Sequence, residues 1–290
     1  MKITVAHLSK DRLSTLPQDE RVALLLVGHV LNELTVLHKL YHASQNPLKE
    51  ATRVERDAQA IQTMILMRTL LGKSVEAWDL YRSKIAPLVK RVGSSLPPEY
   101  YVAVKKINVE FNDPRLTRIR NNVAFHYKDQ HDLIEQHWSD VDFATAGYYY
   151  LSELNLNSLY LASEVVVTEV LAQLSGEKWV QSDMSNDRAQ FGFSEAVKLA
   201  GEIPVEIIYV MNRFMTLIIE KNMPDIFGEQ VEIGRGAKHD EITLSFYWDE
   251  ADFKENWRHP LNPSPRTPDN SRPYHLRATT YPSADHTKAP

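Results

Sequence analysis

The chain has 290 residues, of which 43% are apolar and 24% charged, which is the balance of a globular protein with a sizeable core. It has no cysteine, which excludes disulfide bonds, thiol catalysis and cysteine-ligated zinc. The formal net charge of −5 excludes a uniformly basic surface, so any contact with nucleic acid must come from a local basic patch.

The N-terminal sequence has no basic region followed by an apolar core, so we expect no signal peptide. Two stretches are markedly apolar, from Val22 to Leu31 and from Pro204 to Ile219. The first is too short to span a bilayer, and polar residues interrupt the second. We therefore expect a soluble, cytoplasmic protein that makes no membrane contact.

Helical periodicity predicts three helical regions in the first 111 residues. Pro17 and the two acidic residues near it favour the start of the first. Gly72 is expected to bend or end the second, and Pro87 to kink its continuation. Trp78, Ile85 and Leu88 are core candidates. The expected ranges are 17–44, about 50–71 continuing over 74–92, and about 97–111.

A fourth helix is predicted to start at Asp113 and Pro114, as N-cap and first helical residue. The apolar residues Leu116, Ile119 and Val123 are three and four positions apart, so they are expected to face the core.

The chain after residue 128 carries weaker patterns. The run Tyr148 to Leu151 and the β-prone residues near Leu159 predict a short hairpin, and 162–174 is either helical or part of that strand. A last helical region is expected over 194–222, kinked at Pro204, and an edge strand over 242–247.

The fold class that follows is mainly α, a helical bundle with a short β hairpin and a C-terminal extension. After residue 257, seven of the 15 prolines appear among polar residues, which predicts a disordered tail. We expect three parts: a helical bundle over 1–175, a helical and short-strand extension over 176–257, and the proline-rich tail over 258–290.

The segment from residue 102 to 128 carries six basic and two acidic residues, a local charge of +4 in a chain of −5. It contains Arg120 and His126. A histidine titrates near neutral pH and accepts or donates a proton, while an arginine presents a planar fork to two phosphate oxygens. RNA supplies its own 2′-hydroxyl as nucleophile, so these two side chains are a minimal set for cleavage without a metal.

The spacing of the pair sets a geometric condition. Six residues turn an ideal helix by about 600°, which leaves the two side chains about 120° apart. Arg120 must therefore reach around, the helix must loosen near His126, or a second chain must complete the site. A two-fold dimer meets the last condition because it brings the same patch in twice.

The run from Arg120 to His126, Arg-Asn-Asn-Val-Ala-Phe-His, resembles the signature of the HEPN superfamily. In that signature, four to six residues separate an arginine from a histidine, and a polar residue follows the arginine; here the gap is five. The longer run from Ile119 to Tyr127 is most similar to the abortive-infection branch. The resemblance covers roughly residues 17 to 175. It implies a HEPN-type helical bundle, a homodimer with the motifs facing across the interface, and endoribonuclease activity without a metal.

Carried over residue by residue, the resemblance implies that Arg120 is the phosphate-facing cation, Asn121 the polar orienter and His126 the acid/base. RNA contacts are expected from Arg115, Arg118, Tyr127 and Lys128. We expect no metal and no other cofactor. The expected partners are RNA, a second copy of the chain, and a cognate antitoxin or regulator, as for a toxin or antiphage defence effector.

Three other interpretations stay open. In the first, Arg120 is a surface residue and His126 is a capping histidine at a helix end. In the second, the bundle is a catalytically silent module that binds RNA or docks a partner protein. In the third, His131 and Asp132 belong to a metal-dependent phosphohydrolase, although its further ligands are not identifiable.

Two smaller features favour ordinary structural roles. His38 and His42 are four residues apart and suited to a metal, but no carboxylate lies at a supporting helical step, so we expect no site there. The run Tyr148 to Tyr150 is able to stack bases, but is more typical of a strand that packs on both faces.

Overall fold

The computed structural model describes residues 2–46, 50–92, 96–112, 114–121, 131–152, 157–176, 185–232, 242 and 244–247. These residues are mainly helical, as the sequence predicts. Residues 1–248 form one compact unit, and residues 249–290, which include the expected tail, lie outside the described residues.

The elements follow one another in a simple order. The helices are α1 (Lys10–Thr15), α2 (Gln18–Ser44), α3 (Arg53–Leu80), α4 (Ala86–Val92), α5 (Pro98–Phe111), α6 (Pro114–Ile119), α7 (His131–His137), α8 (Phe143–Ala146), α9 (Leu161–Gly176) and α10 (Ser185–Asn222). The strands are β1 (Lys2–Ala6), β2 (Tyr149–Tyr150), β3 (Leu159–Tyr160) and β4 (Phe227–Glu232). Short π- and 3₁₀-helical turns occupy Tyr81–Ile85, Trp138–Asp140 and Pro224–Ile226.

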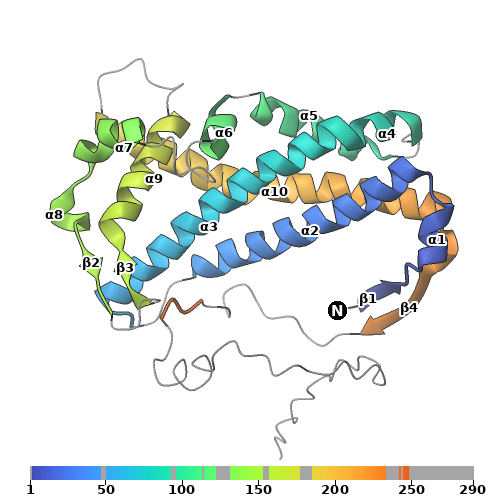
Figure 1. Ribbon diagram of the computed structural model, residues 1–290, viewed down its shortest axis with the longest axis horizontal. Helices are drawn as coiled ribbons and strands as arrows, with labels where there is room; N and C mark the ends of the chain where they lie inside the picture. The colour runs from blue at the N-terminus through green and yellow to red at the C-terminus, as the bar shows by residue number, and fades with distance from the viewer. Residues whose placement is uncertain are drawn as a thin grey trace, which may run out of the picture. The chain divides into compact units, whose positions relative to one another are not determined.

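Three long helices, α2, α3 and α10, lie side by side and form the centre of the unit (Figure 1). Their facing stripes share one apolar core, in which Trp78, Leu70 and Phe214 are fully buried. Burying each such side chain contributes about 1.5–3 kcal/mol. α5 and α9 pack against α10 and extend the same core.

The second predicted helix is longer than its sequence indicates. α3 runs through Gly72, which is buried in the core and does not end it. The helix widens to a π turn only over Tyr81–Ile85, just before Pro87. Pro87 has no N–H for the carbonyl four residues earlier, which accounts for the disturbance at this place. The core candidates Trp78, Ile85 and Leu88 are all buried, as predicted.

Two short antiparallel sheets lie at the edges of the bundle. β2 and β3 form the predicted hairpin, in which Tyr149 pairs with Tyr160 and Tyr150 with Leu159. The chain then enters α9, so the helical alternative for 162–174 is the one that the structure adopts. The second sheet joins β1 to β4, with Lys2 opposite Glu232, and was not predicted.

One expectation for the C-terminal half is wrong, and one stays a prediction. The predicted edge strand at 242–247 is wrong for the residues that the structure describes, because Ile242 and Leu244 to Tyr247 pair with no strand. The division expected at residue 175 stays a prediction, and it lies inside the compact unit of residues 1–248. α10 begins at Ser185, continues through Pro204, and packs against α2, α3, α5 and α9 as a core helix.

α2 is also relevant to the membrane question. Its 27 residues extend the apolar stretch that starts at Val22, and by length and composition it alone among the described helices is able to cross a membrane. A core helix of a soluble protein meets the same criteria, and α2 packs against α3 and α10. The structure is therefore compatible with a soluble protein.

Candidate functional site

Arg120 lies directly after α6, a six-residue helix that contacts α3, α5 and α9. Pro114 begins α6, as the sequence predicts, and Leu116 anchors the helix in the core at 2% exposure. Arg120 and Asn121 then have π-helical hydrogen bonding, so the helix is already widened at the first motif residue. The angle of an ideal helix therefore does not apply at Arg120 and Asn121.

The guanidinium of Arg120 contacts two side chains. Its Nη1 donates to the Oδ1 of Asn121 at 3.3 Å. Its Nη2 lies 3.8 Å from an Oε1 of Glu76 in α3, at the limit of an ion pair. The Nε is buried, and no hydrogen-bond acceptor for it occurs among the described residues. The Arg120 side chain is 34% exposed although its Nε is buried, so solvent reaches only part of the guanidinium.

Glu76 links Arg120 to a chain of alternating charges. Lys73 donates to Glu76 at 3.2 Å and to Glu33 of α2 at 3.1 Å. Burial lowers the pKa of Lys73, but the two carboxylates outweigh this effect and raise it, so the ammonium stays charged. Glu33, Lys73 and Glu76 thus connect α2 and α3 to Arg120, with the 3.8 Å contact as the last link.

The structure describes only some of the other predicted site residues. His126, Tyr127 and Lys128 lie outside the described residues. Arg115 and Arg118 belong to α6, on the turns before Arg120. The structure thus brings Arg120 and Asn121 together and adds Glu76, which sequence reasoning missed. Glu76 lies in a different helix, and no local pattern marks it.

The arrangement favours binding an anion. An exposed ion pair contributes about 0.2–1 kcal/mol, so the 3.8 Å contact with Glu76 restrains Arg120 only weakly. A phosphate group offers two oxygens to the guanidinium and forms shorter, charge-assisted hydrogen bonds. Arg120 is therefore able to exchange Glu76 for a phosphate without unfolding any element.

A second region of interest is the tyrosine pocket beside the β2–β3 hairpin, which has a volume of about 540 Å³. Tyr148 stacks on Tyr150 with ring centroids 6.0 Å apart, and the guanidinium of Arg53 lies 4.1 Å from the Tyr148 ring centroid. Tyr150 donates to Asp57 at 2.7 Å. Tyr149 and Tyr150 thus form a strand that Tyr148 precedes, and of the three side chains only that of Tyr150 is half-buried. The residues that line the tyrosine pocket are Val54, Tyr149, Tyr150, Leu151, Ser152, Asn157 and Tyr247.

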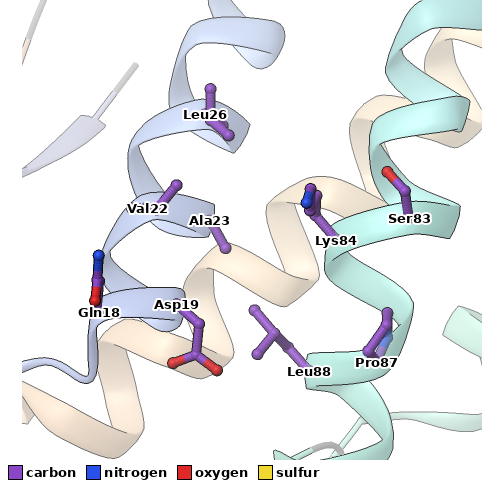
Figure 2. Close-up of a pocket in the computed structure, with 9 residues that line it drawn as sticks. All are labelled: Gln18, Asp19, Val22, Ala23, Leu26, Ser83, Lys84, Pro87 and Leu88. Carbon is purple, nitrogen blue, oxygen red and sulfur yellow. The ribbon is translucent and has the colours of Figure 1, made fainter.

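A third region is the groove between α2 and α4, with a volume of about 590 Å³ (Figure 2). Val22, Ala23 and Leu26 line it from α2, and Lys84 and Leu88 from the π turn and α4. The α2 surface beside it is apolar and open to solvent, since four large apolar side chains are more than a third exposed. They are Val22, Leu25, Leu26 and Val36.

The candidate metal ligands of the phosphohydrolase interpretation are only partly described. α7 carries His131, Asp132, Glu135 and His137. Within the described part of the chain, no group of three His, Asp or Glu side chains gathers around one point.

The chain was compared with known protein families, with curated proteins and with solved structures, and none of them matches it.

Proposed function

We propose that this protein is a metal-independent endoribonuclease of the HEPN type, which cleaves RNA with Arg120 and His126. The observation that carries the proposal is the state of Arg120, whose guanidinium is partly exposed, weakly paired with Glu76 and oriented by Asn121. The sequence Arg-Asn-Asn-Val-Ala-Phe-His and the local positive charge support the same proposal.

In this mechanism the 2′-hydroxyl of the substrate attacks the adjacent phosphorus. His126 takes up the hydroxyl proton or donates a proton to the departing 5′-oxygen, and a second imidazole or water performs the other transfer. Arg120 neutralises the negative charge that grows on the non-bridging oxygens, and Asn121 fixes the plane of its guanidinium. The P–O5′ bond breaks, and the products are a 2′,3′-cyclic phosphate and a free 5′-hydroxyl.

A homodimer supplies the second imidazole, because a two-fold axis beside the motif doubles every group in it. Arg115, Arg118, Tyr127 and Lys128 then contact the substrate backbone. As a cytoplasmic toxin or antiphage defence effector, such an enzyme needs a cognate antitoxin or regulator that blocks the same site.

The test is RNA cleavage in the presence of EDTA. We expect the wild type to cut and to leave 2′,3′-cyclic phosphate ends, and His126→Ala and Arg120→Ala to lose at least 100-fold in rate, in line with the typical contribution of a general acid or base. His29→Ala, a surface histidine of α2, is the matched control and keeps the wild-type rate. Equal cutting by wild type and His126→Ala, or a requirement for a divalent metal, contradicts the proposal.

A second candidate function is a catalytically silent module that docks a partner protein. The observation that favours it is the exposed apolar surface of α2 beside the groove of Figure 2. Leu25→Asp and Val36→Asp then abolish the cellular effect of the protein, whereas His126→Ala leaves that effect intact. The opposite pattern supports the nuclease.

A further inference from the structure

His38 and His42 of α2 lie one helical turn apart and face each other. The Nε2 atom of His38 is 3.0 Å from the Nε2 atom of His42. The two rings are nearly perpendicular, at 72°, with centroids 4.3 Å apart. Both side chains are half-buried, so ions from solvent reach them.

A backbone oxygen from another helix joins the pair. The carbonyl oxygen of Gly201 in α10 lies 3.4 Å from the Nε2 of His38. Gly201 has no side chain, and no atom from another part of the described chain lies within 4 Å of the position that its Cβ would take, so α10 leaves room beside the pair. The Nε2 of His38 thus lies within 3.4 Å of both the Nε2 of His42 and the carbonyl oxygen of Gly201.

We propose that His38 and His42 chelate a late first-row divalent ion, Cu²⁺ or Ni²⁺, with the Gly201 carbonyl oxygen as a further ligand. This site is separate from Arg120 and does not depend on the proposed nuclease activity. A histidine pair at positions i and i+4 on one helix face is an established metal-binding arrangement.

The separation of the two nitrogens is compatible with one shared ion. With metal–nitrogen bonds of about 2.0–2.1 Å, two ligands at a right angle are about 2.9 Å apart, and at a tetrahedral angle about 3.3 Å. The 3.0 Å of the hydrogen-bonded pair lies between these values, so both nitrogens are within reach of one ion in either geometry, and the choice of metal follows from the ligand types and from affinity. Tetragonal sites with nitrogen and oxygen ligands are those of Cu²⁺ and Ni²⁺, and Cu²⁺ binds most tightly in the first-row series.

The remaining coordination positions stay open. No third His, Asp or Glu side chain lies at this point among the described residues. Water or a small exogenous ligand completes the coordination sphere. In the absence of metal, one Nε2 donates to the other, and metal binding moves that proton to the Nδ1 atom of the same ring or to solvent.

The direct test is Cu²⁺ titration of the full chain, followed by electron paramagnetic resonance. We expect one Cu²⁺ per chain with coupling to two imidazole nitrogens in the wild type. His38→Gln and His42→Gln should each weaken this binding at least tenfold and remove the coupling. His29→Gln, on the same helix but outside the pair, should keep both. Identical stoichiometry and spectra in all four proteins overturn the proposal, as does a pair that shares a proton but does not bind Cu²⁺.

An independent readout is thermal unfolding with Ni²⁺, because an ion held between α2 and α10 binds only the folded state. We expect Ni²⁺ to raise the unfolding temperature of the wild type and of His29→Gln, and to leave His42→Gln unchanged. His42→Gln keeps the contact of His38 with Gly201, so it tests the site even where His38→Gln fails to fold. An equal rise in His42→Gln overturns the proposal. RNA cleavage in EDTA is measured separately, so failure of one proposal does not affect the other.

Discussion

At the scale of single residues, the functional proposal depends on the balance between Arg120 and its neighbours. Glu76 competes with any phosphate for the guanidinium, and it is itself shared with Lys73. Because both Arg120 and Glu76 are more than a third exposed, their interaction is screened by solvent and weak. In the proposed nuclease, Glu76 would be a positioning residue that holds the guanidinium near the surface and is displaced by the substrate phosphate.

Glu76→Gln removes this competing charge and keeps the shape of the side chain. We expect RNA to bind about 1.4- to 5-fold more tightly, which corresponds to the 0.2–1 kcal/mol of an exposed ion pair. RNA affinity is measured by fluorescence anisotropy with a short RNA in EDTA. Both proteins carry His126→Ala, so that the RNA is not cleaved. Glu99→Gln, on the exposed first turn of α5, is the control. Weaker binding by Glu76→Gln contradicts this role.

Tyr81 and Tyr100 form a buried pair whose hydroxyl oxygens are 3.0 Å apart. Tyr100→Phe leaves the hydroxyl of Tyr81 without this partner in a site closed to water, and we expect a loss of about 1–3 kcal/mol in the free energy of unfolding. The double variant Tyr81→Phe with Tyr100→Phe should lose less than the sum of the single losses. Urea unfolding of the four proteins measures this coupling, and additive losses contradict it.

The same tyrosines predict alkaline sensitivity. Burial raises the pKa of Tyr41, Tyr81 and Tyr100 above the ordinary value. The folded protein therefore keeps these protons at a pH where the unfolded chain has lost them. The stability is fully present below about pH 10, the pKa of an unfolded tyrosine, and falls as the pH rises beyond it. Urea midpoints at pH 8 and pH 10.5 measure this, and Tyr100→Phe should show a smaller decrease.

Sequence reasoning reached part of the site. Asn121 follows Arg120 directly, so a contact between them was predictable, and the hydrogen bond is present. Glu76 is 44 positions earlier, and only the packing of α6 on α3 brings it near. Local spacing carries no information on such a contact.

At the scale of elements, helix ends were predictable and helix interiors less so. The starts at Pro98 and Pro114 follow from their fixed φ and missing N–H. Gly72 was expected to interrupt α3, but its burial in the core outweighs a helix propensity deficit of only about 1 kcal/mol. The strands β1 and β4 were missed because each is stabilised by the other and not by its own pattern.

The start of α3 makes a local prediction. Thr52 accepts from the backbone N–H of Glu55, and Glu55 accepts from the backbone N–H of Thr52. Thr52→Ala removes half of this capping box, and we expect a loss of about 1 kcal/mol in the free energy of unfolding. Thr69→Ala, inside the same helix at a half-buried position whose hydroxyl donates only to the exposed Ile65 carbonyl, should change stability by less than about 0.5 kcal/mol. Thermal unfolding compares the two, and equal effects would falsify the role of the cap.

At the scale of the whole molecule, α10 determines which part of the chain is able to fold by itself. It is the C-terminal core helix, and Ile207, Met211 and Phe214 contribute fully buried side chains to the shared core. Its contacts with α2, α3, α5 and α9 make the bundle incomplete without it. The division expected at residue 175 did not reveal this, because α10 begins at Ser185, beyond that position.

A chain that ends at residue 175 tests this point. We expect it to expose the faces of α2, α3 and α9 that α10 covers, to bind an apolar dye and to unfold without a cooperative transition. A chain that ends at residue 248 keeps the whole compact unit and should unfold cooperatively, like the full protein. Cooperative unfolding of the shorter chain shows that α10 is an appendage.

The pairing of β1 with β4 bears on how the protein is made. Lys2 finds its partner Glu232 only after 230 further positions of the chain have been synthesised. At about 5–20 residues per second, the ribosome needs about 12 to 46 s to reach that point. For this time, β1 has no β4 to pair with. The sheet of β1 and β4 is therefore among the last contacts of the compact unit to form during synthesis, and until then β1 presents an unpaired strand edge to whatever surrounds the nascent chain.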